Sequence, residues 1–288
     1  MAIDPDFIQA LNRLKIILKK RIYTDRQGEH HAAQGGDSLI FRDYKAYTPG
    51  DDFRRIDWKI YARTDKFYIR RFEAERNMTV HILVDASASM QFGSKVGKGL
   101  RTKFDYAAMM GMGFAYLAVR NNEKFNLSTF TEHVAAFKPK KGAKNLAVLF
   151  DYLGGIRVEG KSNFLQSMDE YRKRITSKSL IVFVSDFLYD PAEVEEILGR
   201  YRKSQVYVIQ VLDPQEKDLQ LAGDVILEDS ETSERMRTFV SNRLRSTYQQ
   251  RLEEHIARLK DICDRNNASF LSLTSNTPAF EAFYHMFR

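Results

Sequence analysis

Short apolar segments alternate with helical patterns over the larger part of the chain. Thr79 to Val84, Ser179 to Val184 and Gln205 to Leu212 are almost continuously apolar and have the length of buried strands. Between the first two lies Phe104 to Val119, whose apolar residues occupy nearly every side of a helix, so this helix should lie against a sheet. Buried strands separated by helices are typical of a parallel sheet covered on both faces. We therefore predict an α/β fold with a doubly wound, mostly parallel sheet.

Weaker patterns complete this arrangement. Further strands are predicted at Lys124 to Phe130, His133 to Phe137, Val225 to Glu228 and Ser269 to Leu273. Further helices are predicted at Lys144 to Leu153, Phe164 to Arg174, Pro191 to Arg200 and Asn242 to Arg265.

The first 76 residues have a different character. They begin with an amphipathic helix whose apolar positions are Phe7, Ile8, Leu11, Leu14, Ile17 and Leu18. A polar loop over Arg26 to Gly36 follows and contains the adjacent pair His30 and His31, which lacks a third metal ligand at useful spacing. We expect two domains: an N-terminal helix, loop and small β-containing extension over residues 1–76, and the sheet domain over residues 77–288.

The stretch YTPGDDFRRIDWKIYAR in this extension combines a Pro-Gly turn with an alternating pattern. In an extended chain Trp58 shares one side with Ile56 and Ile60, and Asp57 lies on the other. The pattern predicts a strand or compact loop in which Trp58 is buried. A second strand is predicted at Lys66 to Arg76.

Composition indicates an ordinary globular protein, with 288 residues of which 43% are hydrophobic and 29% charged. The net charge of +7 comes from 45 basic and 38 acidic residues. Over residues 1–76 the basic excess is mild and interleaved with acids, which favours a solvated surface over a nucleic-acid face. Cys263 is the only cysteine, so a disulfide framework is excluded. We expect a cytoplasmic protein without a transmembrane segment, because no apolar run approaches the ~18 residues of a membrane span.

The residues with the clearest chemistry follow the first buried strand. Asp85, Ser87 and Ser89 are two positions apart, so in an extended chain their oxygen atoms point the same way. Oxygen ligands with few carboxylates suit a hard cation such as Mg²⁺, with Mn²⁺ or Ca²⁺ as alternatives. Ligands of open parallel sheets bind at the carboxyl ends of the strands, which is where these residues lie.

Two other segments point to the same edge of the sheet. Asp186 follows the second buried strand, and Ser162 precedes a predicted helix. The serines would also suit helix caps and turns, but three segments that converge on one edge favour a metal site.

These segments bear a resemblance to known families. DASAS, GKSN and VSDF resemble the metal-ion-dependent adhesion site (MIDAS) of von Willebrand factor A domains. The stretch YTPGDDFRRIDWKIYART, with RRFEAERN after it, resembles the signature of the bacterial DUF58 family, whose members carry such a domain. The resemblance runs from about Arg26 to the carboxyl terminus. It implies the metal ligands Asp85, Ser87, Ser89, Ser162 and Asp186, with Ser162 in place of the usual threonine and Asn163 where an acid is frequent.

The pattern argues against an enzyme. Ser87 stands where an aspartyl phosphatase would need a second aspartate, and neither G-x-S-x-G nor H-E-x-x-H is present. Gly93 to Lys98 is one residue short of a phosphate loop and is interpreted as a loop. Four basic residues nearby are expected to be solvated or to attract an acidic partner: Lys95, Lys98, Arg101 and Lys103.

We therefore expect a non-catalytic, divalent-metal-dependent protein-binding module whose partner offers a carboxylate. The family resemblance implies an adaptor or co-chaperone that works with a MoxR-type AAA+ ATPase. The alternative is a protein that binds nucleic acid or an anionic surface through Arg54, Arg55, Arg70, Arg71 and the KPKKGAK stretch around Lys140.

Overall fold

The computed structural model describes residues 39–74, 78–96, 99–137, 145–176, 179–219, 221, 223–232 and 234–287. They divide into two compact units, residues 39–74 and residues 78–287. The predicted N-terminal helix, the loop with His30 and His31, and the predicted boundary between residues 76 and 77 lie outside the described residues.

The smaller unit is built on an antiparallel hairpin of β1 (Leu39–Ala46) and β2 (Tyr68–Ala74), and β2 confirms the strand predicted there. Between them lie the 3₁₀ helix η2 (Phe53–Arg55) and the helix α2 (Trp58–Thr64), so the alternating stretch, predicted to be a strand or compact loop, forms short helices instead. The reason is capping, because the carboxylates of Asp52 and Asp57 accept hydrogen bonds from the first backbone N–H groups of these helices.

Trp58 is not buried, contrary to the sequence-based expectation. Its side chain is 59% exposed and makes edge contacts with the rings of Tyr61 and Phe67, 6.1 and 6.3 Å away. The buried apolar residues of this unit are instead Ile56 and Ile69, among those described.

Replacing Trp58 with alanine should therefore lower the free energy of unfolding by only about 0.5 to 1.5 kcal/mol, the contribution of aromatic pairs. Ile56→Ala is the contrasting variant, expected to cost about 2 kcal/mol or more because Ile56 is buried. Circular dichroism is the suitable probe of urea unfolding, since Trp58 is the only tryptophan. A larger loss for Trp58→Ala than for Ile56→Ala would show that Trp58 is buried in solution.

The larger unit contains a six-stranded sheet with the order β12-β9-β8-β3-β6-β7, and only β7 runs antiparallel to its neighbour. The strands are β3 (Thr79–Asp85), β6 (Lys124–Phe130), β7 (Val134–Ala136), β8 (Ser179–Ser185), β9 (Gln205–Leu212) and β12 (Ser269–Thr274). The mostly parallel α/β fold predicted from the sequence is therefore confirmed.

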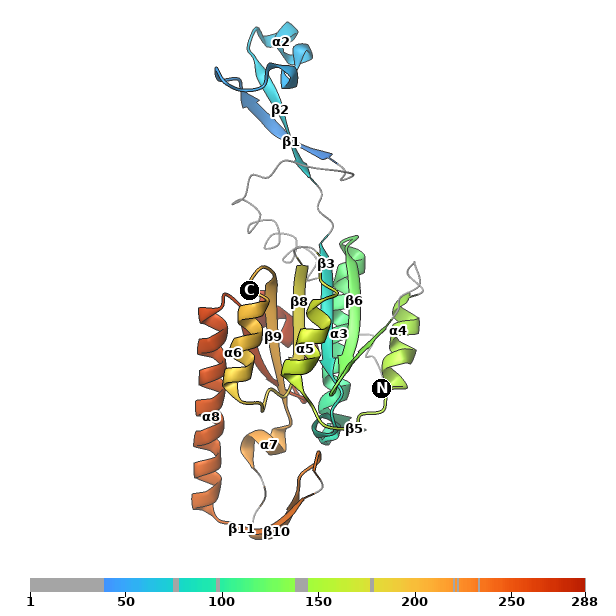
Figure 1. Cartoon of the computed structure of the whole chain (residues 1–288), viewed down its shortest axis with the longest axis vertical. Coiled ribbons are helices and arrows are strands. Elements are labelled where there is room, and N and C mark those ends of the chain that lie inside the picture. The colour runs from blue at the N-terminus through green and yellow to red at the C-terminus, as the bar shows by residue number, and fades with distance from the viewer. Residues whose placement is uncertain are drawn as a thin grey trace. The chain divides into compact units, whose positions relative to one another are not determined.

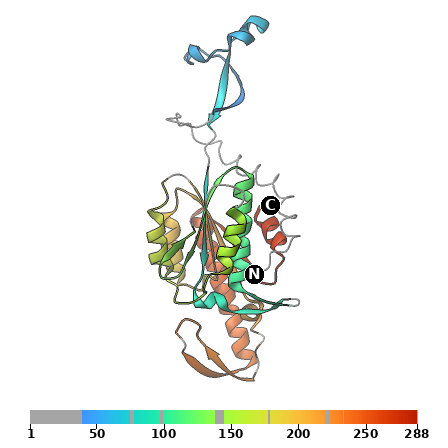
Figure 2. The ribbon, with the colours of Figure 1, turned by 90° about the vertical axis from the view of Figure 1, so that its right-hand side faces the viewer.

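Helices cover both faces of this sheet (Figure 2). One face packs on α3 (Lys103–Arg120), α4 (Asn145–Gly154) and α9 (Ala279–Phe287). The other packs on α5 (Phe164–Arg172), α6 (Pro191–Arg200) and α8 (Asn242–Arg265). Alternate residues of β3 enter the two cores, with Ile82 and Val84 in the first and Leu83 in the second. Helix α3 packs closely on β3 at Gly111. A Cβ atom at this position would lie 3.2 Å from the side chain of Val84.

Several short elements were not predicted. They are η3 (Ala88–Gln91), a hairpin of β4 (Gly93–Val96) and β5 (Gly99–Thr102), α7 (Pro214–Asp218), the strand β11 (Arg235–Val240) and α9. The region interpreted as a loop around Gly93 is thus a strand, and β11 pairs with β10 (Gly223–Glu228) to form a second hairpin. In the described residues, no helix combines the length and apolar character that a membrane span requires.

Candidate metal site at the switch point of the sheet

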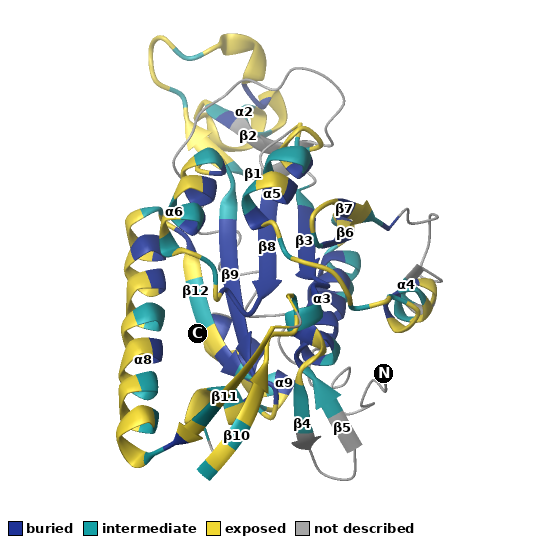
Figure 3. Ribbon diagram, turned by 60° about the horizontal axis from the view of Figure 1, so that its bottom comes forward, coloured by how far each residue is buried: buried dark blue, intermediate teal, exposed yellow. Residues whose placement is uncertain are grey.

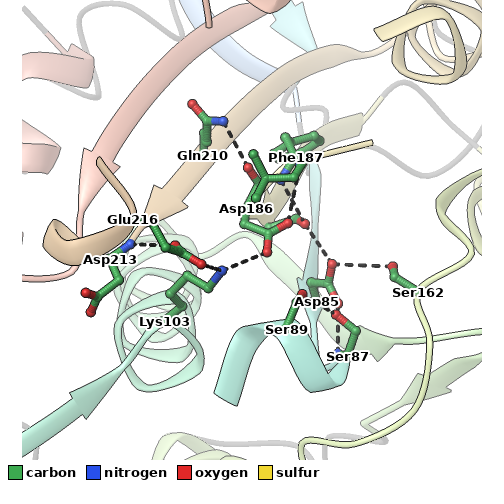
Figure 4. Close-up of polar contacts among 12 residues, drawn as sticks. Asp85, Ser87, Ser89, Lys103, Ser162, Asp186, Phe187, Gln210, Asp213 and Glu216 are labelled. Carbon is green, nitrogen blue, oxygen red and sulfur yellow. Dashed lines mark hydrogen bonds and ion pairs between the residues drawn. The ribbon is translucent and has the colours of Figure 1, made fainter. Parts of the chain in front are cut away.

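The candidate site lies where the strand order reverses. The chain leaves β3 for β6 on one side and later returns to β8 on the other, so the carboxyl ends of β3 and β8 flank the switch point. Asp85 ends β3, and Asp186 directly follows β8. Ser162 reaches the same place from the segment before α5 (Figure 4). The structure therefore brings together the three predicted segments.

Asp85 is fully buried and accepts several hydrogen bonds. Its Oδ1 atom accepts the backbone N–H of Ser87 at 2.9 Å, and its Oδ2 atom accepts the hydroxyl groups of Ser185, at 2.7 Å, and Tyr189. In the described part of the chain, no basic side chain forms an ion pair with Asp85. Burial, and next the charge of Asp186, raise the pKa of Asp85. Within the described residues, the Asp85 carboxylate thus has no counter-charge.

The predicted serines surround this carboxylate. The Oγ atoms of Ser87 and Ser89 lie 3.1 Å apart, and the Oγ of Ser162 lies 3.5 Å from Asp85 Oδ2 and 2.8 Å from the hydroxyl of Tyr189. Asp85 and Ser87 are buried, whereas Ser89 and Ser162 are partly exposed, so solvent reaches the set from the side of these two serines. The Oγ atom of Ser87 is not committed to a helix cap, since Ser87 precedes η3 without a side-chain capping bond.

Asp186 has a partner that the sequence did not reveal. Lys103, the first residue of α3, is 1% exposed, and its Nζ lies 2.9 Å from Asp186 Oδ2 and 2.7 Å from Glu216 Oε1. The expectation that Lys103 is solvated or attracts an acidic partner is therefore wrong, because its ammonium group is buried against two carboxylates of this chain. Burial alone would lower the pKa of Lys103, but the charges of Asp186 and Glu216 outweigh it and raise that pKa. Lys103 stays protonated and neutralises part of the acidic cluster.

Other polar groups hold these residues in position. The side chain of Gln210 donates to the backbone carbonyl of Asp186 at 2.9 Å, and Glu216 accepts the backbone N–H of Asp213 at 2.9 Å (Figure 4). Burial and the charges of Asp85 and Asp186 raise the pKa of Tyr189 well above its usual value, so Tyr189 remains a donor to Asp85. Sequence reasoning missed Tyr189 and Gln210, for which no spacing pattern gave a signal.

The residues present fit a hard divalent cation. Two carboxylates and three hydroxyl groups provide oxygen ligands only, as Mg²⁺, Mn²⁺ and Ca²⁺ prefer. No group of three or more His, Cys, Asp or Glu residues with metal-binding geometry occurs among the described residues, so the donor set depends on the serines. Carboxylates outnumber the single ammonium group of Lys103, and an added cation would reduce this imbalance.

The fold and the site define an α/β sheet protein with clustered carboxylate and hydroxyl groups at its switch point. The family model described as "Protein of unknown function DUF58" matches residues 43–258, more than half of the chain, and the chain belongs to this family. Uncharacterized proteins of Mycobacterium tuberculosis and Mycobacterium bovis are 24% identical to it over 281 residues, which cover 95% of this chain and 86% of theirs.

Two solved structures are similar to the chain over 73% of its length and 98% of theirs. One is an aerotolerance-related membrane protein from Bacteroides fragilis with multiple mutations to serines, with 14% identity and a TM-score of 0.45. The other is the conserved hypothetical protein BatB from Bacteroides thetaiotaomicron, with 12% identity and a TM-score of 0.41.

Proposed function

We propose that this protein is a non-catalytic binding module with a von Willebrand factor A-like fold that captures a protein partner through a divalent cation. The convergence of Asp85, Ser87, Ser89, Ser162 and Asp186 at the switch point carries this proposal. Neutral hydroxyl ligands leave the cation with residual positive charge, which attracts a carboxylate from outside. Such a site resembles a MIDAS, with Mg²⁺ as the expected ion.

The accessibility of the site to solvent supports a protein partner. Ser89 and Ser162 are partly exposed, so an ion held by them would be accessible to a side chain of another molecule. Among the described contacts of Ser87, Ser89 and Ser162, none involves a histidine that would activate a hydroxyl group as a nucleophile. The family resemblance makes a MoxR-type AAA+ ATPase the candidate partner, for which this chain would serve as an adaptor or co-chaperone.

Binding to nucleic acid or an anionic surface is the competing proposal, supported by the exposure of Arg54 and Arg55. The KPKKGAK stretch lies outside the described residues, as do the side chains of Arg70 and Arg71. The two proposals predict different responses of binding to EDTA and to added salt. EDTA should abolish capture of a protein partner, whereas modest added salt should abolish polyanion binding.

The double variant Ser87→Ala with Ser89→Ala tests the site directly. It should fold normally but bind Mg²⁺ about tenfold or more weakly, because two neighbouring ligands are lost. Isothermal titration calorimetry with Mg²⁺ measures this loss. Ser246→Ala, an exposed serine of α8, is the matched control and should bind as the parent protein does. Equal Mg²⁺ affinity in the double variant and the parent would reject the site.

A further inference from the structure

Four aromatic side chains of the smaller unit form one exposed surface, the aromatic patch, made of Tyr47, Trp58, Tyr61 and Phe67. The rings of Tyr61 and Phe67 stack at 4.4 Å, and the ring of Trp58 is nearly perpendicular to both, at 86° and 88°. Tyr47 makes an edge contact with Phe67 at 6.2 Å. Trp58 and Phe67 are exposed, and α2 is exposed along most of its length (Figure 3). The rings therefore fix one another's orientation while they remain accessible to solvent.

Stability does not explain the aromatic patch. Among the described residues of this unit, the buried apolar ones are Ile56 and Ile69, and neither belongs to the patch. Exposed apolar side chains that lie together are unfavourable in water, and patches of this kind mark binding sites. Trp and Tyr often dominate protein interfaces, because they bring a large contact area with few rotatable bonds. We therefore expect a ligand to cover the patch.

The carboxylates of the surrounding stretch are engaged within the unit. Asp52 and Asp57 accept backbone N–H groups in the first turns of η2 and α2, both at 3.0 Å. Asp51 forms an ion pair with Lys45, also at 3.0 Å. These acids stabilise the local fold and leave the basic side chains of the stretch uncompensated.

The basic side chains lie beside the aromatic patch. Lys59 and Arg63 are one turn apart on α2, on the side of the helix next to Trp58, and both are exposed. Arg54 is exposed as well, and its guanidinium group lies 6.0 Å from the centre of the Phe53 ring. In the part of the chain that the structure describes, none of these three cations has an acidic partner. The patch therefore has a basic rim, formed by Lys59, Arg63 and Arg54, that is complementary to a negatively charged ligand.

A peptide suits this surface better than a nucleic-acid strand does. Single-stranded nucleic acid binds by stacking its bases on open ring faces. In the aromatic patch, Tyr61 and Phe67 each use one ring face to stack on the other, and Trp58 is not parallel to either. An apolar centre with a polar rim is instead the usual arrangement of protein interfaces.

We propose that the aromatic patch and its basic rim form a docking surface for an acidic peptide segment of a partner protein. Apolar side chains of this segment cover Trp58 and Phe67, and the flanking Asp or Glu residues pair with Lys59 and Arg63. The contact involves no metal ion, so it is independent of the proposed cation site and gives the protein a second point of attachment. It also gives the stretch around Trp58 a role other than stability.

The fluorescence of Trp58 reports directly on this surface, because Trp58 is the only tryptophan. A phage-displayed library of random peptides, selected on the full chain in EDTA, supplies the probe. We expect the selected peptides to combine Asp or Glu with apolar residues. The most enriched one, as a synthetic peptide, should shift the Trp58 emission to shorter wavelength as the ring leaves water. Failure of the selection, selected peptides without acidic residues, or an unshifted emission would overturn the inference.

Two variants test the rim and the patch separately. Lys59→Glu should bind the selected peptide about tenfold or more weakly, and it should fold because an acid suits the first turn of a helix. Lys203→Glu, at an exposed lysine of the larger unit, is its matched control. Trp58→Ala should lose a similar factor in calorimetry, whereas Phe239→Ala, which removes an exposed ring of β11, should bind as the parent does. Parent-like binding by Lys59→Glu or by Trp58→Ala would reject the surface.

Oligothymidylate and phosphatidylglycerol vesicles test other anionic ligands. At the same concentration of negative charge as the peptide, both should leave the Trp58 emission unchanged. If either shifts the emission as the peptide does, the surface binds polyanions and the inference is wrong. All of these measurements are made in EDTA, so a failure of the proposed metal site would not change their outcome.

Discussion

Replacing Lys103 with methionine is expected to lower the free energy of unfolding by about 3 to 5 kcal/mol, as when one member of a buried ion pair is removed. The lysine side chain is 1% exposed and contacts both Asp186 and Glu216. Methionine fills a similar volume but leaves these two carboxylates without a cation in the interior. Urea unfolding in EDTA measures the loss.

Mg²⁺ should restore part of this stability, because the variant has one more uncompensated negative charge at the site. The melting temperature of Lys103→Met should therefore rise more with Mg²⁺ than that of the parent. Lys217→Met, an exposed lysine on α7, is the control and should change stability by about 0.5 kcal/mol or less. An unchanged unfolding midpoint for Lys103→Met would show that the ion pairs with Asp186 and Glu216 do not stabilise the protein.

Asp85→Asn should separate metal binding from folding. In EDTA this variant is expected to melt no lower than the parent, because removing the charge relieves repulsion from Asp186 while the amide oxygen still accepts hydrogen bonds. It should lose the stabilisation that Mg²⁺ gives the parent. That stabilisation is about 1.4 kcal/mol at ten times the dissociation constant. It corresponds to a shift of a few degrees, taking about 2 to 4 °C per kcal/mol.

Thermal melts of both proteins with and without Mg²⁺ make the comparison, and Asp218→Asn is a control at an exposed aspartate.

Any difference between the melting temperatures of Asp85→Asn and the parent in EDTA should disappear as the pH is lowered. The pKa of Asp85 is raised, so the folded protein binds this proton more tightly than the unfolded chain, and protonation removes the same charge as the substitution. An equal response of both proteins to Mg²⁺ would show that Asp85 does not hold the ion.

The sequence revealed the parts of the fold with a strong apolar pattern. The bounds of α6, α8 and β9 match the predicted ranges because each carries a continuous or amphipathic pattern with clear ends. The strand β11 was missed because its residues are mostly exposed, which leaves no apolar alternation to detect. A strand or compact loop was predicted where α2 lies, because capping by Asp57 outweighs the alternating pattern of the sequence.

The sequence indicated which residues meet at the candidate site, but not how their charges are balanced. Asp85 and Asp186 look equivalent in the sequence, yet within the described part of the chain only Asp186 has an ammonium partner. The available signal was the position of Lys103 in the first turn of α3, where the helix dipole disfavours a cation unless carboxylates compensate it.

The central position of β3 in the sheet has a consequence for how the protein is made. Asp85 receives its hydrogen bond from Ser185, which lies 100 residues later in the chain, and β3 is paired on that side by β8. A nascent chain that ends before β8 therefore exposes one edge of its most buried strand and lacks Asp186. Synthesis must pass this point before the proposed cation site can assemble, so Mg²⁺ binding there would distinguish chains that extend past Asp186 from shorter translation products.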